Sequence, residues 1–178
     1  MSKQKEDTLE SNKTVMRRML EAYNTGDTEI VKELLDVNIH DHSREIGFEA
    51  GLRRAHAIRR VQSEILRHED AFPDKKFTEE LLIAEGDTVM LRWSFTGTHL
   101  GPILGIPPTG KQVRAHGTEV VRIKNGKIIE HLGDEGMNLL NILWQLDKLD
   151  KDILRRIEEG DASLGEYHRT GDFTPSNK

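Results

Sequence analysis

The stretch TVMLRWSFTGTH, residues 88–99, alternates apolar and polar side chains along most of its length. Successive side chains of a β-strand point to opposite faces of its sheet, so this alternation predicts a strand with one buried face. The apolar face carries Val89, Leu91, Trp93 and Phe95, and the other carries Met90, Arg92, Ser94 and Thr96. Because the apolar face must turn away from water, we expect Trp93 and Phe95 to line an internal pocket.

Further strands are predicted on both sides of this stretch. Residues 77–85 are β-like and are joined to it by the turn at 85–87. Residues 113–123 form another long strand, and Asn125-Gly126 is a strong hairpin signal that leads into a partner strand over 127–135. The middle of the chain therefore predicts an antiparallel sheet.

Helical periodicity dominates the two ends of the chain. Apolar residues recur at helical spacing over 9–24, after residue 30, over 49–70 and over 138–159, while 38–47 is predicted to be an extended loop. Helices before a sheet make an α+β fold, with one domain over 9–159 and flexible tails at 1–8 and 160–178. Leu149, Ile153 and Ile157 of the last helix would pack either on the chain's own sheet or on another subunit.

Composition narrows the classes of function. The formal net charge is −5, which argues against nucleic acid as a general partner, since phosphates attract basic surfaces. Arg53, Arg54, Arg59 and Arg60 are interpreted as a solvated helix face. The chain has no cysteine, no signal-peptide pattern and no apolar run near the roughly 20 residues that cross a bilayer. We expect a cytoplasmic protein that binds neither membranes nor nucleic acids.

Two motifs suggest ligands and have simpler interpretations. Gly105 to Lys111 has the spacing of a phosphate-binding P-loop, but Pro107 and Pro108 lack N–H groups and a strand follows, so nucleotide binding is not expected. The connector 101–111 would form either the rim of a cavity or a plain loop. His40-Asp41-His42 could hold a metal, but we expect none, with His42 as a hydrogen-bonding group in a pocket.

Three further histidines lie in or beside the predicted strands. His99, His116 and His131 are followed by two carboxylates, Asp134 and Glu135. A sheet that curls around a cavity would bring such residues together. An apolar pocket shifts the pKa of a carboxylate or imidazole, which suits acid–base catalysis.

Several motifs in fixed order resemble a known family. They are Phe72-Pro-Asp, Leu82-Ile-Ala-Glu-Gly-Asp87, Arg92-Trp93, Thr96-Gly-Thr-His99, Leu104-Gly-Ile-Pro-Pro-Thr-Gly110 and Asn125-Gly-Lys-Ile-Ile-Glu-His131. Together they are similar to the SnoaL-like polyketide cyclases over about residues 12–147. The resemblance implies an NTF2-like cone, in which a curved antiparallel sheet wraps around a pocket, and a homodimer. It also implies an aldol ring closure on a small carbonyl compound, without a metal or cofactor.

The resemblance leaves the acid unmatched. The family's catalytic Asp falls on Gly136 without a gap, or on Asn138 with an insertion of two residues, and Leu132 replaces the family's Trp. Asp134 shares the side of Leu132 by alternation and is our first candidate for the acid.

Glu135 is the second candidate, because the glycines at 133 and 136 would allow a bulge that turns it to the same side. His116 and His131 are expected to assist, and His42, His99 and Asn138 to line the pocket. Two alternatives stay open: isomerisation or dehydration on the same site, and a non-catalytic small-molecule binding protein. Asp134 and Glu135 could also be a solvated turn before the last helix.

Overall fold

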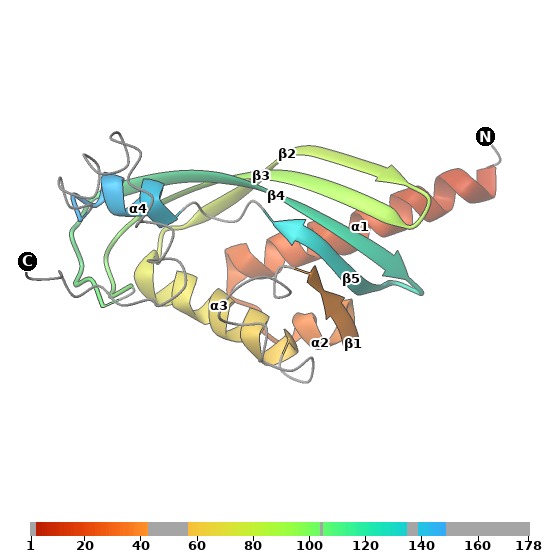
Figure 1. Ribbon diagram of the computed structural model, residues 1–178, viewed down its shortest axis with the longest axis horizontal. Helices are drawn as coiled ribbons and strands as arrows, with labels where there is room; N and C mark the ends of the chain where they lie inside the picture. Colours follow the sequence, from red (N-terminus) through yellow and green to blue (C-terminus); the bar gives the residue numbers. More distant parts are fainter. Residues whose placement is uncertain (1–2, 43–56, 104, 135–138, 149–178) are drawn as a thin grey trace, which may run out of the picture.

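Five strands form one curved sheet in the order β1-β5-β4-β3-β2 (Figure 1). The computed structural model describes residues 3–42, 57–103, 105–134 and 139–148. The strands are β1 (Leu35–Asp41), β2 (Lys76–Glu85), β3 (Thr88–Thr98), β4 (Gln112–Lys124) and β5 (Lys127–Asp134). The helices are α1 (Lys3–Thr25), α2 (Ile30–Leu34), α3 (Ala57–Ala71) and α4 (Leu139–Gln145). The predicted α+β class, with strands in the middle of the chain, is confirmed.

Strand β3 pairs with β2 and with β4, and β4 pairs with β5. All three pairings are antiparallel, as the alternation and the turns predict. The hairpin between β4 and β5 is closed by Asn125 and Gly126, whose φ angles of 52° and 74° are both left-handed. Such a pair gives the turn the twist that the flanking strands need, so the predicted two-residue hairpin is confirmed.

Strand β1 corrects one prediction. The loop expected over 38–47 begins as a strand, because β1 pairs in parallel with β5 at the edge of the sheet. Leu35 and Ile39 of this strand are buried, and burying them explains why the segment is held in the sheet. The part of the expected loop from residue 43 onward lies outside the described residues.

Helices α1, α2 and α3 lie on one side of the sheet (Figure 1). Helix α1 turns Val15, Met16, Met19 and Ala22 toward the core and begins at Lys3, earlier than the predicted start at residue 9. At its other end the Asn24 side chain donates to the Phe77 carbonyl (3.0 Å) and accepts from the Phe77 N–H (2.7 Å). This pair of hydrogen bonds ties the end of α1 to the start of β2. The predicted beginning of the third helix, 49–56, lies outside the described residues.

The last helix is shorter than its periodicity predicts. Helix α4 ends at Gln145, and Asp147 has a left-handed φ of 54°, so one continuous helix over 138–159 is wrong at this point. The break follows Ile142 and Leu146, which are both buried, so the described helix packs on its own chain. Leu149, Ile153 and Ile157 lie outside the described residues.

The connector between β3 and β4 docks on the end of α3. The N–H groups of Leu100 and Gly101 both donate to the carbonyl of Ala71, at 2.9 and 3.2 Å. Just beyond the end of β3 and before the start of β4, the Gly110 N–H donates a hydrogen bond to the His99 carbonyl at 2.9 Å. A Cβ at Gly101 would lie 1.9 Å from the carbonyl oxygen of Asp70, so the close approach requires glycine.

Two irregularities in β5 decide which of its side chains face inward. Ile123 pairs with Ile128 and Arg122 with Glu130, which leaves Ile129 as an extra residue, and a second register shift falls at Leu132. Without the first bulge, Glu130 would share the side of Ile128. With it, His131 takes that side, and Leu132 is exposed.

The other face of the sheet carries apolar side chains in one row. Ile83, Met90 and Val120 are cross-strand neighbours on β2, β3 and β4, and they alternate with the buried residues of the core. Ile83 is 49% exposed, and Leu81 and Leu132 are also exposed. Among the described residues, no helix is long and apolar enough to cross a membrane.

Candidate functional site

A cavity of about 160 Å³ lies between the inner face of the sheet and the helices α1 and α3. Its apolar wall is formed by Met16, Met19, Leu20, Leu35, Ile39, Val61, Phe77, Leu91, Val121 and Ile128. Its polar wall is formed by Tyr23, Arg60, Glu64, His68, Trp93, Glu119 and His131. An apolar cavity with a few converging polar groups is the usual form of a small-molecule site.

His131 is held between two carboxylates. Its Nδ1 lies 3.1 Å from Asp41 Oδ1, and its Nε2 lies 2.7 Å from Glu119 Oε2. Burial alone would lower the pKa of this imidazole, but hydrogen bonds to Asp41 and Glu119 and their charges raise it to about 10. His131 is therefore an imidazolium near neutral pH, with both N–H groups donated.

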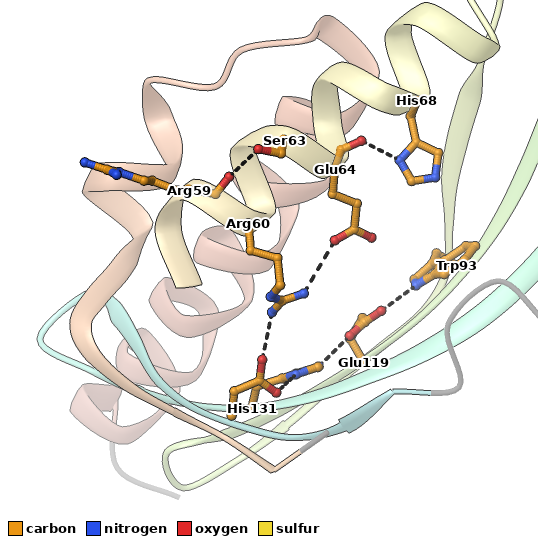
Figure 2. A network of polar contacts seen from close by, with 9 residues as sticks. Arg59, Arg60, Ser63, Glu64, His68, Trp93, Glu119 and His131 are labelled. Atoms are coloured by element: carbon orange, nitrogen blue, oxygen red, sulfur yellow. Dashed lines mark hydrogen bonds and ion pairs between the residues drawn. The ribbon is translucent and has the colours of Figure 1, made fainter. Parts of the chain in front are cut away.

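The polar contacts continue on both sides of His131 (Figure 2). Arg60 donates to Asp41 at 2.7 Å and lies 3.6 Å from a carboxylate oxygen of Glu64. On the other side, Trp93 Nε1–H reaches Glu119 Oε1 at a long 3.4 Å. We call Arg60, Glu64, Asp41, His131 and Glu119 the ion cluster. It joins α3 to three strands, and its carboxylates outnumber its cations by one.

Two further titratable groups lie on the helical side of the cavity. Burial, followed by the charges of Glu64 and Glu119, raises the pKa of Tyr23 well above its usual value, so its hydroxyl stays protonated. Burial lowers the pKa of His68 to about 4, so this imidazole is neutral near pH 7. The cavity thus holds one charged and one neutral histidine.

Of the predicted site residues whose side chains the structure describes, two line the cavity, Trp93 and His131. Phe95 lies on the same face of β3 as Trp93, but it packs in the core against Phe72 and Phe77, with ring centroids 5.2 and 4.9 Å apart. Phe95 does not line the cavity, because it lies two residues further along β3, where these aromatic rings fill the core.

Three predicted histidines lie elsewhere. His116 is cross-strand from Ser94 on the outer face, because the inner side of β4 is taken by Val113, Ala115 and Val121. His42 does not line the cavity and instead contacts Glu130 at 2.8 Å. His99 is fully buried in the strand end, where its Nδ1 lies 3.0 Å from Thr109 Oγ1. None of the three lines the cavity as described.

The carboxylates predicted as proton carriers cannot be placed as side chains. Asp134 is in backbone register with Glu119, while Glu135 and Asn138 lie outside the described residues. The register shift at Leu132 interrupts the alternation of β5 and leaves Leu132 exposed, so alternation from Leu132 does not decide which side Asp134 takes.

The remaining motifs of the sequence are the connector 101–111, the segment His40-Asp41-His42 and the basic face of α3. The connector 101–111 contributes no described residue to the cavity wall, which favours a plain loop over a rim. His40 and His42 pack ring against ring, with centroids 4.2 Å apart, while Asp41 belongs to the ion cluster. No group that could hold a metal is found among the described residues. Arg60 of the predicted basic face turns inward, whereas Arg59 is exposed.

Several cavity residues were missed in the sequence, although two signals point to them. Glu119 is a charged residue on the inner side of β4, at even spacing from Val113, Ala115 and Val121. Glu64 and His68 follow the buried residues Val61 and Ile65 at helical spacing, so they share that face of α3. Charged residues on otherwise apolar faces mark the site.

Several known proteins are similar to this chain in sequence or in fold. Aklanonic acid methyl ester cyclase DauD of Streptomyces sp. (strain C5) is 31% identical over 120 residues, 66% of this chain and 71% of DauD. The cyclase DnrD of Streptomyces peucetius, which has the same activity name, is 31% identical over 123 residues, 66% of this chain and 79% of DnrD. The solved structure of TsrD from Streptomyces laurentii superposes with a TM-score of 0.66 and 29% identity, covering 78% of this chain and 96% of TsrD.

The fold and its solved neighbours define an α+β protein of the NTF2-like class, with a curved, unclosed sheet around a cavity. Within that class, residues 13–146 match the SnoaL-like polyketide cyclases. The chain belongs to this family.

Proposed function

We propose that this chain is a cofactor-independent acid–base enzyme that closes a ring in a small, uncharged carbonyl compound, with Glu119 carrying the proton. One observation supports the assignment above others. Glu119 lies at the wall of an apolar cavity, with one oxygen bound to the His131 imidazolium. Among the described residues, its other oxygen is reached only by a long contact from Trp93. That second oxygen is the carboxylate atom best able to meet a substrate proton.

The proposed reaction is an intramolecular aldol condensation. A Glu119 oxygen takes the proton from the carbon beside a carbonyl, and the C–H electron pair passes to the carbonyl oxygen as an enolate. The enolate carbon attacks a second carbonyl of the same molecule, forming a C–C bond and an alkoxide. Glu119 then returns the proton to the alkoxide, so no net proton and no electron is consumed.

His131, Asp41 and Arg60 are positioning residues in this proposal. Asp41 holds Nδ1 of His131 so that Nε2 faces Glu119, and Arg60 holds Asp41 from α3. The imidazolium keeps a positive charge beside the atoms where negative charge moves during the reaction. Because the ion cluster carries one more carboxylate than cations, an anionic substrate would be repelled, which supports an uncharged one.

The relatives support ring closure as the type of chemistry. DauD and DnrD are named as cyclases of a methyl ester, an uncharged form of an acid. Isomerisation or dehydration would use the same first proton transfer. The second candidate is a non-catalytic binding protein on the same fold, and it is favoured by Gly136 or Asn138 at the position of the family's acid.

Proton exchange tests the proposal without knowledge of the final product. NMR would follow deuterium exchange at the acidic carbon of an uncharged β-keto ester, at a pH where spontaneous exchange is slow. Glu119→Gln should lower the protein-catalysed rate by about 10²-fold or more. Glu130→Gln is the matched control, because it makes the same change on the next strand, outside the cavity.

Full exchange activity in Glu119→Gln would remove this residue from the mechanism. Saturable binding of the keto ester without exchange above the background rate would favour the binding protein instead.

We also propose a homodimer formed through the outer face of the sheet. The row of Ile83, Met90 and Val120, with Leu81 and Leu132 nearby, leaves apolar surface on that face. Contiguous apolar surface on a folded chain commonly marks a protein interface.

A further inference from the structure

His68 lies on the inner face of α3, one turn after Glu64, and its ring contributes to the cavity wall. Aromatic rings hold it in place, since its centroid lies 5.9 Å from Tyr23 and 5.7 Å from Phe77, in edge-to-face arrangements. Figure 2 shows the ring projecting from α3, with one nitrogen bound to the helix backbone and the other pointing away from that bond. The orientation of the ring is therefore fixed.

The hydrogen bond to the helix also fixes the tautomer. Nδ1 of His68 lies 2.9 Å from the carbonyl oxygen of Glu64. A carbonyl can only accept, so Nδ1 carries the proton and Nε2 of the neutral ring presents a lone pair. Burial keeps the pKa of His68 at about 4, so this state persists at neutral pH.

Nε2 of His68 has no hydrogen-bond partner in the described part of the chain. No described residue donates a hydrogen bond to it, and it is not sealed in the core as Nε2 of His99 is. The terminal nitrogens of Arg60 are directed to Asp41 and Glu64, and the ring nitrogens of His131 to Asp41 and Glu119. Arg60 Nε is buried and has no hydrogen-bond partner among the described residues, so it does not donate to His68 either. The cavity therefore offers a neutral acceptor on its helical side, across from the carboxylate of Glu119.

We propose that Nε2 of His68 accepts a hydrogen bond from a hydroxyl group of the ligand and so selects hydroxylated carbonyl compounds. The inference rests on the proposed function, because it assumes that the ligand's carbonyl end lies near Glu119. A hydroxyl can donate to the lone pair, whereas a methoxy group cannot and would leave the acceptor unpaired in a buried site. His68 is thus a specificity residue, with no part in the proton transfer.

Matched ligands separate this role from simple packing. The probes are 4′-hydroxyacetophenone, 4′-methoxyacetophenone and acetophenone. These single-ring ketones are chosen because a cavity of about 150 Å³ accepts benzene, and this cavity measures about 160 Å³. Calorimetric titration would give the three dissociation constants at pH 7. The wild-type chain should bind the hydroxy compound about tenfold more tightly than the methoxy compound.

Three variants carry the test. His68→Phe keeps an aromatic ring and removes the acceptor, so the preference should fall to within about twofold while acetophenone binding is retained. His68→Gln restores an acceptor oxygen and should recover part of the preference. His42→Phe, a histidine outside the cavity, should leave the preference unchanged. Thermal unfolding of each variant shows that it is folded.

The outcomes separate the two proposals. A preference that persists in His68→Phe would mean that another acceptor, such as the carboxylate of Glu64, binds the hydroxyl, and it would overturn the role of His68. Equal binding of the hydroxy and methoxy compounds by the wild-type chain would also overturn it, leaving the acid–base proposal intact. If none of the three ketones binds, both the inference and the proposed ligand class are wrong.

Discussion

At the scale of single residues, the pKa values of two histidines in one cavity are shifted in opposite directions. His131 lies between the carboxylates of Asp41 and Glu119, and its pKa rises to about 10. His68 lies among aromatic rings with a backbone carbonyl as its polar contact, and its pKa falls to about 4. The difference comes from their partners, because only nearby negative charge compensates for the loss of water around a cation.

The raised pKa of His131 predicts a loss of stability at alkaline pH. Its folded pKa of about 10 exceeds the ordinary histidine pKa of 6.5, so its contribution to stability is fully present below pH 6.5 and disappears as the pH approaches 10. His131→Gln should lower the free energy of unfolding by on the order of 3 kcal/mol near pH 6, because two partly buried carboxylates lose their cation. Urea unfolding at several pH values would measure the difference, which should shrink toward pH 10. A difference that does not change with pH would contradict the ion pairing.

The lowered pKa of His68 predicts the opposite dependence. Its contribution is present above pH 6.5 and is lost as the pH falls toward 4, because only the unfolded chain takes up the proton in that range. The stability of His68→Phe relative to wild type should therefore improve between pH 6.5 and 4. Unfolding curves for both proteins in the same buffers would show it. If the two curves shift in parallel, the ring is open to water and its pKa is not lowered.

At the scale of elements, the contact between the β3–β4 connector and the end of α3 allows no side chain at residue 101. Gly101→Ala would place a Cβ against the backbone oxygen of Asp70, and backbone cannot move aside cheaply. We expect a loss of at least about 1–3 kcal/mol in the free energy of unfolding. Pro107→Ala, an exposed change in the same connector, should cost less than about 1 kcal/mol. Similar unfolding midpoints for both variants would mean that the connector is not docked on α3.

At the scale of the whole molecule, the outer face of the sheet is where we expect self-association. Ile83→Lys would place a charge in the apolar row of β2, β3 and β4, so it should weaken a dimer by at least about tenfold in its dissociation constant. Sedimentation velocity over a range of concentrations would measure this. Val37→Lys, at an exposed apolar position on the far edge strand β1, is the control. If the wild-type chain sediments as a monomer at all concentrations, the proposed dimer does not form.

Local signals along the chain were enough to predict most of the helices and strands and the fold class. Alternation over 88–99 placed Trp93 on the inner face, and Asn125-Gly126 placed the hairpin, because both depend on neighbours along the chain. The ordered motifs indicated the family that the comparisons show. These signals are local, so they survive without knowledge of the tertiary contacts.

The polar groups that share the cavity could not be predicted in this way, because contacts between distant segments bring them together. The bulge at Ile129 turns His131 inward and Glu130 outward. The residues Ile128-Ile129 do not predict this bulge, because a bulge depends on the pairing of two strands. The register of β4 with β3 and β5 then brings Glu119 beside His131 and Trp93. Asp41 arrives from a parallel edge strand and Arg60 from a helix. Contacts between distant segments specify such a cluster. The sequence therefore shows which residues share a face of one strand or helix, but not which faces meet.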